Sequence, residues 1–173
     1  MYRIVGIDPG LRQTGFGIVD CDKNSITYIK SGLIKTAATN KHLPDRLKTI
    51  FDGVMEIIET YKPNVMSIEK TFVNMNPQSS LSLGHARGMA IAAAIQNNMD
   101  IFEYTALQIK KSVVGHGHAK KLQVQAMVQR LLDLPEMLGP DSSDALASAL
   151  CHFRIAPTNI LKKGNSFKDG RVI

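Results

Sequence analysis

The spacing of hydrophobic residues changes along this chain, and that change constrains the fold more than any other feature. The chain begins with β-branched runs separated by turn residues, which predicts strands at residues 2–7, 16–19 and 25–34. At residues 44–61 the apolar side chains instead recur every three or four positions, the period of an amphipathic helix. The beginning of the chain is therefore expected to form an antiparallel meander followed by a helix.

Strand and helix patterns then alternate. Short apolar runs predict strands at residues 65–68 and 101–104, and helical patterns occupy residues 78–96, 106–114, 119–132 and 141–153. Parallel strands need long crossover connections, and helices between strands supply them. We therefore predict an α/β fold: a mixed β-sheet, with the first three strands antiparallel and the later ones parallel, flanked by helices.

Length and charge are those of one domain with a basic end. The chain has 173 residues, enough to bury a core without disulfides. Its formal charge of +6 is compatible with a polyanionic partner, and part of it is local, since five basic residues and one acid follow residue 153. We expect one folded domain at 1–155 and a basic, flexible C-terminal tail at 156–173.

Cysteine use and hydropathy point to the cytoplasm. Cys21 and Cys151 are far apart and form no metal-binding or disulfide motif, so both are expected to be reduced thiols. The first residues do not have the layout of a secretory signal, and the longest apolar run is too short to span a bilayer. A cytoplasmic protein without membrane segments is expected.

Four acids lie where predicted elements begin or end. Asp8 closes the first strand in GIDPG, Glu69 follows the strand at 65–68, and Asp141 and Asp144 stand at the start of the last helix. An acid at such a terminus can point into a crevice beyond the sheet. Each also has a structural explanation: a turn-forming Asp before Pro-Gly, a surface Glu at a strand end, and a helix N-cap for Asp141 or Asp144.

Four carboxylates gathered in one cleft favour a divalent cation. Like charges raise one another's pKa, and a bound cation removes that penalty. Ligands that are all oxygens favour Mg²⁺, for which Mn²⁺ can substitute, over zinc. Two ions in each active site could support hydrolysis of a phosphodiester without a nucleophilic side chain.

Two sets of small residues invite close contacts. Gly15 and Gly17 at the start of the second strand would allow a substrate backbone to approach the hairpin. Gly84, Gly88 and Ala92 form a stripe on the helix at 78–96, for which packing against the sheet is the favoured explanation and self-association the alternative.

Five segments together resemble the RuvC-type Holliday-junction resolvases. They are GIDPG from residue 6, IEK at 68–70, LGHARG at 83–88, VVGHGHAKKLQV at 113–124 and DSSDALA at 141–147. The resemblance implies an RNase H-like fold, a homodimer, and Mg²⁺-dependent symmetric cutting of four-way DNA junctions in recombination and repair. It also implies that Asp8, Glu69, Asp141 and Asp144 are the catalytic, metal-binding acids. Some relatives carry His at the position of Asp141.

The resemblance also implies DNA-binding residues and a partner. Phe72 matches an aromatic that stacks on a base near the junction centre. Lys110 and Lys121 match positions involved in DNA binding, and Lys111 and Lys120 extend the same basic stretch. His116 and His118 are expected to be polar loop residues. A branch-migration helicase complex of the RuvA and RuvB type is the implied partner.

Three other functions compete with this interpretation. A YqgF-like nuclease with the same fold would act on RNA or on other branched DNA, but the VVGHGHAKK and DSSDALA segments favour the resolvase. An actin-like or sugar-kinase ATPase shares the Gly-x-Asp start, but it needs a second lobe that 173 residues do not provide. A binding module without catalysis would have no need of all four acids.

Overall fold

Five strands form one mixed sheet. The computed structural model describes residues 2–23, 25–36, 42–70 and 77–156. The strands are β1 (Tyr2–Asp8), β2 (Gln13–Cys21), β3 (Ile26–Lys35), β4 (Val65–Glu69) and β5 (Asp100–Tyr104), in the spatial order β3-β2-β1-β4-β5. The β1–β2 and β2–β3 pairs are antiparallel, and the β1–β4 and β4–β5 pairs are parallel. The predicted mixed sheet is confirmed.

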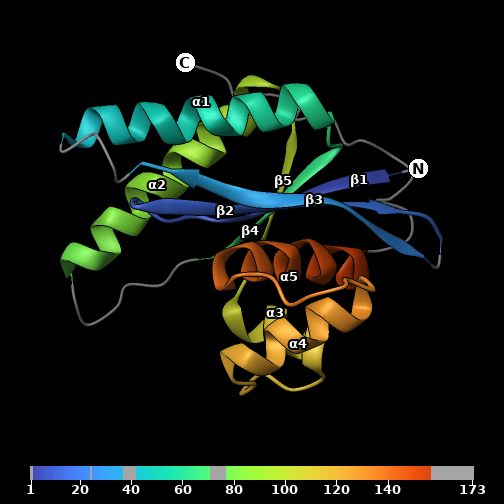
Figure 1. Cartoon of the computed structure of the whole chain (residues 1–173). Coiled ribbons are helices and arrows are strands. Elements are labelled where there is room, and N and C mark those ends of the chain that lie inside the picture. The colour runs from blue at the N-terminus through green and yellow to red at the C-terminus, as the bar shows by residue number, and fades with distance from the viewer. Residues whose placement is uncertain (1, 24, 37–41, 71–76, 157–173) are drawn as a thin grey trace, which may run out of the picture.

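Helices cover both faces of this sheet (Figure 1). One face carries α1 (Leu43–Tyr61) and α2 (Pro77–Gln96), which also pack against each other. The other face carries α5 (Pro140–Ile155), with α3 (Ala106–Val114) and α4 (Lys121–Leu131) packed beneath it. The predicted order of elements is therefore confirmed, and the tail predicted at 156–173 lies outside the described residues except for Ala156.

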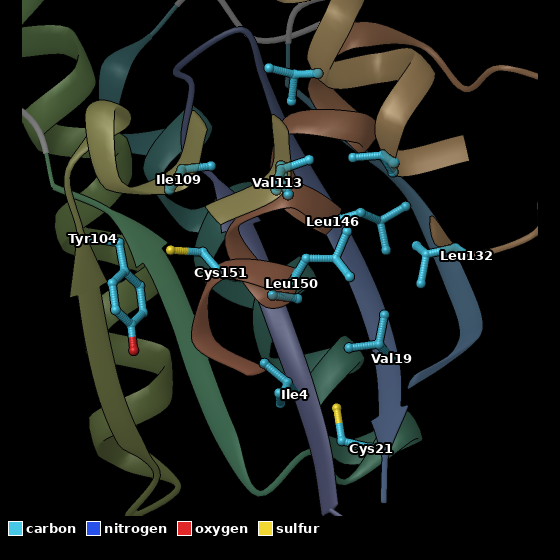
Figure 2. Packing of buried hydrophobic residues seen from close by; sticks show 14 of the residues in the cluster. Ile4, Val19, Cys21, Tyr104, Ile109, Val113, Leu132, Leu146, Leu150 and Cys151 are labelled. Atoms are coloured by element: carbon cyan, nitrogen blue, oxygen red, sulfur yellow. The ribbon is translucent and has the colours of Figure 1, made fainter. Parts of the chain in front are cut away.

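Two hydrophobic clusters hold the three layers together. The cluster between the sheet and α5 includes Ile4, Val19, Leu146 and Leu150, which point toward one another in Figure 2. The cluster on the opposite face joins side chains of the sheet to α1 and α2. Because β1 is the central strand, its apolar side chains enter both clusters, and the end of β1 is held in a fixed place.

The stripe on α2 is not packed against the sheet, so the favoured prediction was wrong. Ala86, Ala90, Ala93 and Ala94 are the fully buried residues of α2. A side chain added at Gly84 or Gly88 would meet nothing within 4 Å among the described residues. Leu81 and Ile95, at helical spacing from these glycines, are 57% and 60% exposed. This second face of α2 is open and apolar.

Membrane insertion finds no support in the helices. No helix in the described part of the chain is both long enough and apolar enough to cross a bilayer.

Candidate active site

Two of the four acids end neighbouring parallel strands. Ile7 of β1 pairs with Ile68 of β4, so the next residues, Asp8 and Glu69, leave the sheet side by side. The hydroxyl of Thr14 donates to the carbonyl of Gly10 (3.0 Å) and fixes the turn after Asp8. Each acid therefore stands at the carboxyl edge of the sheet, where α/β proteins form their binding crevices.

The other two acids lie in the first turns of α5. Gly139 is the N-cap of this helix and makes no side-chain cap, and Pro140 is its first residue. Asp141 and Asp144 therefore do not cap α5, contrary to the structural alternative. The hydroxyl of Ser67 donates to the carbonyl of Ser148 (2.7 Å) and ties α5 to β4 inside the core.

The glycines of β2 serve the packing of α5. A side chain at Gly15 would lie 2.2 Å from the carbonyl oxygen of Asp141, and one at Gly17 would overlap Leu146. The prediction that these glycines admit a substrate backbone was wrong for that reason, because α5 already occupies the space. Because neither glycine has a side chain, the start of α5 can lie directly against β2, next to the end of β1 and Asp8.

The four acids influence one another electrostatically. The pKa of Asp8 is raised to about 7, by burial first and then by the carboxylates of Asp144, Asp141 and Glu69 in that order. Burial, then Asp144, also raises the pKa of Glu69. The site therefore holds more negative charge than its own surroundings stabilise.

A cavity of about 230 Å³ opens beside these acids. Glu69 and Asp144 line it together with Lys110 and Lys121, above an apolar floor of Ala106, Ile109 and Val124. Lys111 and Lys120 are exposed outside it, as are His116 and His118 in the turn between α3 and α4. Phe72 lies outside the described residues. The structure thus separates the four predicted lysines into two that line the cavity and two that do not.

Two acids are engaged by neighbouring polar side chains. Gln13 donates from Nε2 to a carboxylate oxygen of Asp141, and Nζ of Lys121 lies 2.8 Å from Oδ2 of Asp144. With the side chains so placed, no three His, Cys, Asp or Glu residues in the described ranges could together hold a metal ion. A rotation of the Asp141 and Asp144 side chains away from Gln13 and Lys121 would be required first.

The chemistry of the site nevertheless fits a divalent cation. All four candidate donors are carboxylates at the ends of rigid elements, and the three others all raise the pKa of Asp8. A cation would relieve the repulsion that raises the pKa of Asp8.

Sequence reasoning missed two polar neighbours of the acids. Gln13 begins β2 and reaches Asp141 across the helix start. Arg87 of α2 donates from Nε to the carbonyl oxygen of Glu69 (3.3 Å). Arg87 belongs to the LGHARG segment noted above, but no local pattern indicates which distant carbonyl an arginine will reach.

Comparison with known proteins gives one consistent family. A family model described as crossover junction endodeoxyribonuclease RuvC matches residues 4–152. The RuvC of Methylobacillus flagellatus is 56% identical, with 87% of this chain and 86% of that protein covered. The RuvC of Cupriavidus taiwanensis is 49% identical, with 99% of each chain covered.

Solved structures agree with these relatives. Thermus thermophilus RuvC in complex with a Holliday junction substrate is 29% identical, covers 90% of this chain and 95% of its own, and has a TM-score of 0.84. The yeast mitochondrial resolvase Ydc2 is 14% identical with a TM-score of 0.60, covers 88% of this chain and 79% of its own, and supports the fold alone. The predicted RNase H-like fold is confirmed by the likeness to two Thermus thermophilus RuvC structures, one of them the junction complex.

Proposed function

This chain belongs to the RuvC family of crossover junction endodeoxyribonucleases, and we propose that it resolves four-way DNA junctions by cutting two strands at symmetric positions. The observation that carries the proposal is the convergence of four carboxylates at one edge of the sheet, beside a cavity lined by two lysines. A family member of known structure has been captured with a Holliday junction substrate. Recombination and DNA repair are the processes in which such junctions arise.

Asp8, Glu69, Asp141 and Asp144 would hold the divalent cations. The proposed ions are Mg²⁺, with Mn²⁺ as a substitute, and two in each site. When bound, they supply Lewis-acid activation of water and stabilisation of the leaving oxygen. The chain's own contribution is to carry the four carboxylates on three rigid elements, so that only side-chain rotations would be needed to bring them onto the ions.

The lysines would hold the DNA backbone. Lys110 and Lys121 line the same cavity as Glu69 and Asp144, so a phosphate drawn to them lies next to the acids. The hydrogen bond to Asp144 raises the pKa of Lys121, which therefore stays charged. Lys111 and Lys120 would contact phosphates farther away, and Phe72 remains the predicted base-stacking residue.

A two-fold dimer would present two such sites to one junction. The open face of α2, formed by Leu81, Gly84, Gly88 and Ile95, is apolar, and its glycines allow another backbone to come close. This supports self-association, the alternative that the sequence left open. Family membership further implies a branch-migration complex of the RuvA and RuvB type as a partner.

The function is tested with three labelled substrates. Purified protein is incubated with an immobile four-way junction, a linear duplex and an RNA:DNA hybrid, each with Mg²⁺ or with a chelator. Paired symmetric nicks in the junction alone, dependent on Mg²⁺, are expected. Cutting of the hybrid instead would favour a YqgF-like nuclease.

The dimer face is tested by filling its open space. Gly88→Arg should leave a folded chain, because nothing among the described residues lies near that position, yet it should elute as a monomer. Junction binding should weaken as well. A dimer of wild-type affinity in Gly88→Arg would place the interface elsewhere.

A further inference from the structure

Arg87 joins α2 to the two strand ends at the candidate active site. Its Nε donates to the carbonyl oxygen of Glu69 at 3.3 Å. Its guanidinium also forms an ion pair with Glu103 of β5, and its side chain is 19% exposed. One largely buried arginine therefore contacts the ends of β4 and β5 at the same time.

Those contacts lie where Glu69 leaves the sheet. Glu69 pairs with Tyr104 at the last position of the β4–β5 register, and the next amide, from Lys70, donates to the carbonyl of Tyr104 (2.8 Å). Beyond Lys70 the described residues stop until residue 77. The carbonyl held by Arg87 is thus the last on β4, in the peptide unit that directly follows the Glu69 side chain.

We propose that Arg87 is a positioning residue for Glu69, holding the end of β4 so that the Glu69 carboxylate stays beside Asp8 and Asp144. The inference rests on the proposed function, because it assigns Glu69 to the metal-binding acids. A fork of N–H donors suits this role, since one side chain can reach a carbonyl and a carboxylate together. Lysine, with a single charged nitrogen, cannot span both.

A residue that orients a metal ligand usually matters for metal affinity. Loss of such an outer partner lowers metal affinity or activity by about 10- to 100-fold in other proteins. Arg87 also lies on the helix whose open face is proposed to form the dimer. The same side chain that orients Glu69 therefore connects the acids to the element that would contact a second copy of the chain.

Arg3 is a matched control at the opposite end of the sheet. It too bridges a backbone carbonyl and a carboxylate, donating to the oxygen of Tyr61 (2.6 Å) and to Asp20. It contacts none of the four acids. Arg3→Met and Arg87→Met therefore remove the same kind of bridge, one far from the acids and one beside them.

The test measures Mn²⁺ binding to the DNA-free protein by electron paramagnetic resonance. Arg87→Met should weaken Mn²⁺ binding by about 10-fold or more and raise the Mg²⁺ concentration needed for half-maximal cutting by a similar factor. Saturating Mg²⁺ should restore most of the rate. Arg3→Met should lower thermal stability without changing either metal dependence. Arg87→Lys should recover stability but not Mn²⁺ affinity.

The outcomes separate this inference from the proposed function. Wild-type Mn²⁺ affinity in folded Arg87→Met would overturn the positioning role, as would recovery of Mn²⁺ affinity in Arg87→Lys in step with stability. If Arg87→Met does not fold, Arg87→Lys alone decides by the same criterion. A wild-type chain that binds Mn²⁺ but cuts no junction would overturn the proposed function and leave the affinity comparison valid.

Discussion

The aspartates at the two ends of the layer formed by β1, β2 and α5 have opposite electrostatic surroundings. At the acidic end, defined by Asp8, Glu69, Asp141 and Asp144, burial and like charges raise the pKa of Asp8 to about 7. At the paired end, defined by Arg3, Asp20 and His152, Arg3 donates to both carboxylate oxygens of Asp20 at 2.7 Å each. One hairpin therefore holds one aspartate paired with an arginine and one aspartate surrounded by like charges.

The strand register explains the difference. Across the antiparallel pair, Asp20 faces Arg3, whereas Asp8 faces Gly15, which carries no charge. The glycine instead lets α5 bring two further carboxylates close. The acid opposite the arginine is neutralised by an ion pair, whereas the acid opposite the glycine has other acids beside it, the surroundings that are typical of a functional site.

The largest effect should follow from neutralising the acidic end. Asp8→Asn is expected to slow junction cutting in Mg²⁺ by on the order of 10³-fold, because a metal ligand contributes several kcal/mol to the transition state. Junction affinity in a chelator should persist. In a chelator, the free energy of unfolding of Asp8→Asn should exceed that of wild type, because the neighbouring carboxylates no longer face a like charge. Single-turnover cutting, gel shift and urea unfolding measure the three; a wild-type cutting rate would contradict the metal assignment.

The next largest effect should follow from pushing the start of α5 away from β2. Gly15→Ala places a methyl group against the carbonyl of Asp141, and backbone on both sides leaves little room to adjust. We expect a loss of about 3 kcal/mol in the free energy of unfolding, together with slower cutting. Thermal and urea unfolding measure the first, and single-turnover assays the second. Unchanged stability would mean that α5 lies farther from β2 than described.

The paired end should respond to acid through His152. This histidine is fully buried, and its Nδ1 lies 2.8 Å from the hydroxyl of Tyr104. Burial lowers its pKa to about 4. The unfolded chain, with a pKa of about 6.5, binds the proton more readily, so stability is complete above that pH and falls as the pH drops toward 4.

That loss should reach about 3 kcal/mol at pH 4. Urea unfolding of wild type and His152→Phe at several pH values isolates the contribution of His152, because all the other titratable groups are present in both proteins. The difference between the two should grow as the pH falls below about 6.5. Parallel curves would show that His152 is not the group responsible.

The sequence predicts the architecture better than the contacts. The order of strands and helices and the position of each acid at an element's end follow from local period and turn residues. Which face of α2 packs against the rest of the protein could not be predicted, because both sides carry small residues, alanines on one and glycines on the other. The contacts of Gln13 and Arg87 could not be predicted either, since they join distant segments through tertiary packing.

The smallest of these effects should come from unpairing the second aspartate. Asp20→Asn removes the charge that neutralises Arg3, whose side chain is 30% exposed and can recover some hydration. We expect a loss of about 2 kcal/mol in the free energy of unfolding, below the range for fully buried pairs. Junction cutting should be unchanged, because Asp20 lies at the far end of β2 from Asp141.

The double variant Arg3→Met/Asp20→Asn sharpens that result. If the loss arises from an unpaired guanidinium, removing Arg3 as well should return part of the stability. Urea unfolding of the two single variants and the double variant measures the coupling. Additive losses would mean that the pair contributes little as a pair. The contrast between the two ends would then rest on the acidic end alone, where the register places a glycine opposite Asp8.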